Sequence, residues 1–113
     1  MSGAISRLSR EKDFKKINSR GKSFFSSLFR LRVLDNHSQR SRFSVVITTK
    51  VSKKATVRNR LKRQVKEIVR LNSAKLKQGR DFIIMVNSPA LGKSYQDLEK
   101  DLLNLFIKSK LFL

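Results

Sequence analysis

Residues 50–70 read KVSKKATVRNRLKRQVKEIVR, and this stretch decides the fold. It contains nine lysines or arginines and a single acid, Glu67. Apolar residues recur within it at steps of three and four: Val57, Leu61, Val65 and Ile68. This spacing is typical of an amphipathic helix with one buried face. We therefore expect a helix over Ala55–Leu71.

The charged side of this helix is crowded with cations. Every fourth residue from 58 to 70 is basic: Arg58, Lys62, Lys66 and Arg70. Like charges at this spacing destabilise a helix by about 0.2–0.5 kcal/mol per neighbouring pair. A helix that only had to be soluble would interleave acids, so the stripe indicates a polyanionic partner.

The whole chain is basic, and its charge is uneven. It has 113 residues, enough for one domain, and a formal net charge of +19. Residues 1–70 carry twenty cations and four acids, net +16, whereas residues 71–113 carry seven cations and four acids, net +3. The N-terminal two-thirds is therefore expected to face the partner.

Nucleic acid is the partner that such a charge favours, because lysines and arginines that bind its phosphates release condensed counterions, and this release favours binding. A membrane surface is a weaker alternative, since the basic helix lacks aromatic anchors and the longest apolar run, Phe82–Val86, is far too short to span a bilayer. A DNA-binding protein is a further alternative, but no clear helix-turn-helix is visible. The chain has no cysteine and residues 1–10 hold no apolar signal core, so a cytoplasmic location is expected.

The remaining segments predict a sheet with helices packed on it. The chain is expected to form a single RNA-binding domain over residues 1–113, in which residues 1–10 are a flexible basic arm. The other expected elements are a helix over Glu11–Asn18, period-two strand structure over Lys22–Leu34, a strand over Phe43–Thr49, a buried strand over Asp81–Asn87 and a last helix that Ser94 caps. The fold class is thus α+β: a single-domain α-β sandwich with a roughly four-stranded sheet and three helices, in the order α-β-β-β-α-β-α.

Several of these segments carry a family resemblance. The run RNRLKR at residues 58–63, preceded by Lys50 and by Lys53-Lys54-Ala55, resembles the RNR signature of the bacterial ribonuclease P protein subunit. The other segments that follow the family order are Asp13-Phe14, Arg20-Gly21-Lys22-Ser23, Phe43-Ser44-Val45, Gly79–Val86 and Tyr95–Glu99. The resemblance covers residues 7–112. It implies a left-handed βαβ crossover that carries the signature, against the usual right-handed rule.

The resemblance also implies a function and two groups of site residues. The protein would join a catalytic ribonuclease P RNA and help it remove the 5′ leader of precursor tRNA. Residues expected to bind RNA are Lys50, Lys53, Lys54, Arg58, Asn59, Arg60, Lys62, Arg63 and Lys66. Residues expected to bind the single-stranded leader, in a cleft between the first helix and the sheet, are Phe14, Lys15, Arg30 and Arg32.

For each of these residues, a role in solvation or core packing remains an alternative to RNA contact. The basic helix face could be merely solvated, as could the face that bears Arg30 and Arg32. Phe14 could stack on an unpaired base or simply pack with Ile17. Because Arg32 stands where an aromatic residue is common in the family, we expect leader contact to depend more on phosphate pairing. Phe24 and Phe25 are expected to pack in the core.

The polypeptide itself is not expected to cut RNA. Its one histidine, His37, falls in an expected turn, and general acid–base catalysis would want two suitable groups. Its eight acids are scattered along the sequence, whereas a protein-held Mg²⁺ would want clustered carboxylates. We therefore expect no catalytic or metal-binding side chain, and Mg²⁺ held mainly by the RNA partner. The rival function is a ribosomal or other structural RNA-binding protein with no processing role.

Overall fold

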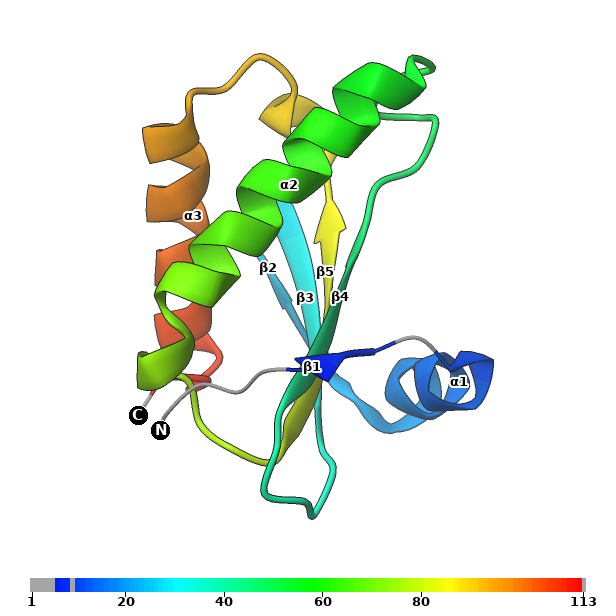
Figure 1. The fold of residues 1–113 in the computed structure, drawn as a ribbon, viewed down its shortest axis with the longest axis vertical. Helices are drawn as coiled ribbons and strands as arrows, with labels where there is room; N and C mark the ends of the chain where they lie inside the picture. The colour runs from blue at the N-terminus through cyan, green and yellow to red at the C-terminus, as the bar shows by residue number, and fades with distance from the viewer. Residues whose placement is uncertain (1–5, 9, 113) are drawn as a thin grey trace.

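The computed structural model describes residues 6–8 and 10–112, and its main elements follow the expected order (Figure 1). The elements are β1 (Ser6–Arg7), α1 (Glu11–Arg20), β2 (Lys22–Phe25), β3 (Phe29–Asp35), β4 (Arg42–Val46), α2 (Ala55–Leu71), η1 (Ser73–Lys75), β5 (Arg80–Val86), η2 (Ser88–Ala90) and α3 (Tyr95–Lys108). The α+β class, the three helices and the four main strands are confirmed. The bounds of the basic helix are the expected ones.

The strands form one mixed sheet in the order β1-β4-β5-β3-β2. β5 lies at its centre, parallel to β4 and antiparallel to β3. The chain leaves β4, passes through α2 and returns as β5 beside it, which makes a βαβ crossover with the basic helix as its connection. The left hand of this crossover stays a prediction of the resemblance.

Helices cover both faces of the sheet (Figure 1). α2 and α3 pack on one face over the larger apolar cluster, which includes the fully buried Phe29, Phe82 and Phe106. α1 lies on the other face over a smaller cluster centred on Ile17 and Ile83. Since β5 is covered on both sides, its residues 82–86 are apolar without alternation, as the sequence predicted.

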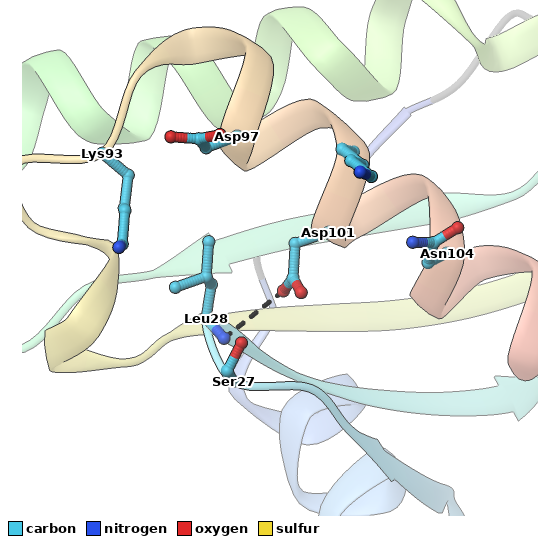
Figure 2. Close-up of a pocket in the computed structure, with 7 residues that line it drawn as sticks. Ser27, Leu28, Lys93, Asp97, Asp101 and Asn104 are labelled. Atoms are coloured by element: carbon cyan, nitrogen blue, oxygen red, sulfur yellow. Dashed lines mark hydrogen bonds between the residues drawn. The ribbon is translucent and has the colours of Figure 1, made fainter.

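The stretch Lys22–Leu34 forms two antiparallel strands, β2 and β3, which agrees with the three strands expected before the basic helix; residues 26–28 turn the chain back on itself. The Ser26 hydroxyl accepts a hydrogen bond from the Phe29 amide at 3.0 Å and donates to the Asp101 carboxylate of α3. Asp101 also accepts from the Leu28 amide at 3.3 Å (Figure 2). A carboxylate more than 70 residues away thus stabilises this turn. The turn leaves Phe25 56% exposed, so the expectation that this residue packs in the core is wrong.

The expected N-terminal arm is also partly wrong. Ser6 and Arg7 pair in parallel with β4, and the Leu8 amide donates to the Phe43 carbonyl at 2.8 Å. Leu8 is 1% exposed and joins the cluster under α1, and this burial holds the segment on the sheet. Residues 1–5 and 9, which the same prediction covered, lie outside the described residues.

Candidate nucleic-acid interface

The apolar stripe of α2 fixes which side of the helix faces outward. Leu61, Val65, Ile68 and Val69 are buried against the sheet and α3. Leu61 lies inside the signature run and is 6% exposed, so the signature carries a core residue between its cations. Burying this stripe leaves the basic positions on the outer faces, where several side chains border solvent.

The loop before α2 is held in place by its own polar groups. The Arg58 guanidinium donates to the Ser52 carbonyl at 2.8 Å, and the Lys54 amide donates to the Ser52 hydroxyl at 3.2 Å. Val51 is 6% exposed and anchors the loop to the core. Arg58 therefore shapes the loop as well as carrying charge. The loop and the first turn of the helix contain no acid, although the positive end of a helix dipole favours negative charge.

The structure brings some of the expected RNA-binding residues together. Lys62 and Lys66 are half-buried and border a hollow on α2 with the side chains of Thr56, Asn59 and Arg63. Arg60 is exposed on the same helix, and Lys50, Lys53 and Lys54 are exposed in the preceding loop. Contact of these residues with RNA stays a prediction.

Within residues 6–8 and 10–112, no carboxylate neutralises the expected RNA-binding cations of this face. Within the described part of the chain, none of the eight expected RNA-binding cations lies within 4.0 Å of a carboxylate. The ion pair on α2 joins Arg70 and Glu67 at 3.6 Å, and both side chains are largely exposed. The pKa of Lys66 is lowered by partial burial and by the neighbouring charges of Lys62, Arg7 and Arg70. The face is therefore electrostatically unsatisfied in the free protein.

The first helix and the sheet bring Phe14 and Arg30 to the α1 side of the molecule. Phe14 is half-buried and packs against the cluster of Leu8, Ile17 and Ile83, so part of its ring stays accessible. Arg30 is half-buried, and its guanidinium carbon lies 5.4 Å from the centre of the Phe25 ring. Its buried Nε has no hydrogen-bond partner within the described structure. Lys15 is exposed and lies 3.7 Å from Glu11 on its own helix.

Arg32 lies in a different setting from the one expected. Its guanidinium donates to the carbonyls of Ile17, Asn18 and Gly21 and to the Ser23 hydroxyl, at 2.6 to 3.3 Å. Four of the five N–H groups of an arginine are thus used on the end of α1 and the start of β2. These contacts satisfy carbonyls at the end of α1, and contact of Arg32 with a leader phosphate stays a prediction.

Arg42 is a residue that the sequence analysis missed. Its guanidinium forms an ion pair with Asp13 of α1 at 3.1 Å and two hydrogen bonds with Asp81 of β5. These contacts join α1 to the sheet at one end of the side that bears Phe14. No sequence pattern links positions 13, 42 and 81, so only the folded chain reveals the group.

Two further classes of site are not formed by the described residues. No helix of the described chain has the length and apolar character needed to cross a bilayer. Within residues 6–8 and 10–112, no three histidine or acidic side chains gather in a way that could hold a metal ion.

The fold and this interface define a class: a small α+β protein with a basic helix whose charge calls for a polyanion. The chain matches the family model described as ribonuclease P over residues 4–110. It is 37% identical to the ribonuclease P protein component of Clostridium acetobutylicum over 107 residues, which covers 93% of this chain and 89% of that protein. It is 39% identical to the Synechocystis protein over 101 residues, 88% of this chain and 82% of that protein. The chain belongs to the ribonuclease P protein component family.

Solved structures support the same assignment. The ribonuclease P protein from Thermotoga maritima superimposes with a TM-score of 0.83 at 31% identity, and the match covers 91% of this chain and 96% of that chain. The Staphylococcus aureus protein gives a TM-score of 0.87 at 21% identity over 95% of this chain and 97% of that chain. At that lower identity the likeness shows the shared fold alone.

Proposed function

We propose that this chain is the protein subunit of an RNA-based ribonuclease P that acts in the cytoplasm. It binds the ribonuclease P RNA and the 5′ leader of precursor tRNA and assists the endonucleolytic removal of that leader. The observation that carries the proposal is the unneutralised cationic face of α2 in a chain of this family. Guanidinium groups suit phosphates because they donate two parallel hydrogen bonds, and Asn59 adds a neutral donor and acceptor for a base edge or a sugar.

Catalysis is assigned to the RNA and to Mg²⁺ bound mainly by it. Three of the eight acids offer poor ligands, because Asp13 and Asp81 are both bonded to Arg42 and Asp101 holds the Ser26 turn. The only histidine, His37, is exposed in the β3–β4 loop beside Asp35. Mg²⁺ on the RNA would supply charge neutralisation and an activated water. The protein would contribute binding and would screen the phosphate repulsion between the two RNA molecules.

Reconstitution separates this function from its rival, a structural RNA-binding protein. The purified chain is added to the ribonuclease P RNA of the source organism and to labelled precursor tRNA at a low Mg²⁺ concentration. We expect faster release of an intact leader, because the cations of the protein replace part of the screening that Mg²⁺ would provide. Binding without acceleration would favour the structural RNA-binding protein. Equal acceleration by a polylysine of the same charge would show that charge alone, without the folded basic face, accounts for the effect.

Phe14 provides a test of the leader cleft. In the holoenzyme, Phe14→Ala is expected to weaken binding of precursor tRNA by about 1–3 kcal/mol, the usual contribution of one stacked base. Binding of mature tRNA, which has no leader, should not change. Phe112→Ala is the matched control, because Phe112 packs on Phe106 in the other cluster. Equal losses for precursor and mature tRNA would show that Phe14 only packs the core.

A further inference from the structure

A second hollow lies between α2 and the edge of the sheet. It has a volume of about 240 Å³ and is lined by Arg7, Phe43, Ser44, Lys62, Lys66 and Arg70. Four of its six lining residues are cations, and none is an acid. Arg7 and Arg70 were not among the residues that the sequence analysis assigned to RNA binding.

The fold brings these cations together from two distant segments. Positions 62, 66 and 70 lie on one side of α2 because four residues make about one helical turn. Arg7 reaches the same hollow because β1 pairs in parallel with β4, with Arg7 opposite Phe43. The buried side chain of Leu8 holds this segment on the sheet. The hollow therefore belongs to the fold and does not arise from a chance meeting of long side chains.

Among the described residues, the hollow's only ion-paired cation is Arg70, which lies near Glu67. In the part of the chain that the structure describes, Arg7, Lys62 and Lys66 form no ion pair. The pair of Arg70 with Glu67 is long at 3.6 Å, and the Arg70 side chain is 73% exposed. The lowered pKa of Lys66 has partial burial as its first cause and repulsion from the other three cations as its second. An anion in the hollow would relieve that repulsion.

We propose that this hollow binds one phosphate group of an RNA strand. Arg7 would donate to the phosphate from β1 and Arg70 from α2, Lys62 and Lys66 would supply further positive charge, and the Ser44 hydroxyl would add a neutral donor. The ring of Phe43 gives the hollow an apolar wall, which suits a ribose better than a free, fully hydrated ion. The assignment to RNA rests on the proposed function; the preference for a phosphate rests on the lining residues alone.

The hollow also extends the expected interface. Lys62 and Lys66 line both this hollow and the one formed with Thr56, Asn59 and Arg63. The two lysines thus border both hollows. A strand that passes over them would place one phosphate in each hollow, so the RNA path would run from the signature helix toward the N-terminal segment.

The test measures how RNA affinity depends on salt. Arg7→Ala and Arg70→Gln should each reduce the slope of log affinity against log salt, and by no more than about 0.9, because both arginines share one phosphate contact. Arg7→Lys should keep the slope, because the charge remains. Lys12→Ala is the control: Lys12 is an exposed cation on α1, away from the hollow. Thermal unfolding of each variant shows whether it folds. If one of the two arginine variants does not fold, the other still tests the proposal.

A titration with inorganic phosphate, followed by NMR, checks the ligand chemistry. We expect the amide shifts to gather at Arg7 and Ser44 and the pKa of the Lys66 ammonium to rise as the counter-charge arrives. Shifts scattered over the surface, or RNA slopes unchanged in both arginine variants, would overturn the proposal. If the wild-type chain accelerates leader release while both slopes stay unchanged, only this site is refuted. If the slopes fall but no acceleration occurs, the phosphate site stands and the processing role is refuted.

Discussion

Replacing Lys53, Arg60 and Arg63 together by alanine is expected to weaken binding of the ribonuclease P RNA on the order of a hundredfold. All three side chains are exposed, and none forms an ion pair within the described structure. Each phosphate contact contributes about 1 kcal/mol of counterion release near a salt concentration of about 0.15 M. Three lost contacts amount to about 3 kcal/mol, and each 1.4 kcal/mol is about tenfold in affinity.

The salt dependence gives this prediction its second measurement. The slope of log affinity against log salt should fall by about 2.7, because each lost contact removes about 0.9. The matched control replaces Lys75, Lys93 and Lys100 by alanine, which lowers the net charge equally at three exposed positions outside α2. If the control loses as much affinity as the test variant, net charge alone drives binding and the signature face has no special role.

Stability should hardly change in the triple variant, since surface substitutions of this kind usually stay within about 0.5 kcal/mol. Removal of repelling cations would, if anything, stabilise α2. A loss of RNA affinity combined with equal or higher stability is the result that separates a binding face from a structural one.

The sequence predicted the parts of the fold that local patterns control. The three- and four-residue apolar steps placed α2 at its observed bounds, and the run at residues 82–86 placed the central strand. Ser94 caps α3 as expected, with its hydroxyl accepting from the Asp97 amide at 3.1 Å. These features depend on residues within a few positions of each other, so a single sequence contains them.

The features that the sequence did not reveal depend on distant partners. The turn at residues 26–28 needs Asp101, and β1 needs the edge of β4. The period-two pattern predicts the sheet face on which Arg32 lies. It does not predict that the Arg32 guanidinium donates hydrogen bonds to carbonyls at the end of α1. The close approach at Gly21 also depends on the fold: a Cβ there would lie 2.5 Å from the Ile17 carbonyl oxygen, which also accepts from Arg32. Arg70 could have been found on the four-residue stripe, whereas Arg7 could not.

Arg42→Met is expected to lower the free energy of unfolding by about 3 kcal/mol, the lower end of the range for breaking a buried ion pair. The Asp81 side chain is 5% exposed and would lose its charged partner, keeping one hydrogen bond from the Asn36 amide at 2.7 Å. The lower end applies because the Arg42 side chain is 33% exposed and methionine retains much of its apolar stem. Urea is the suitable denaturant, since guanidinium chloride would screen the charges under study.

Two further variants decide whether the unpaired charge of Asp81 is the cause. Adding Asp81→Asn to Arg42→Met should restore part of the lost stability, because the buried charge is removed along with its partner. Arg40 is an exposed residue of the loop between β3 and β4. Arg40→Met should therefore change the free energy of unfolding by no more than about 0.5 kcal/mol. If the second substitution restores nothing, packing of the arginine stem accounts for the loss.

Arg42 also contacts Asp13 of α1 at 3.1 Å. Without this contact, α1 would hold Phe14 less firmly over the sheet. We therefore expect Arg42→Met to reduce the difference in affinity between precursor and mature tRNA.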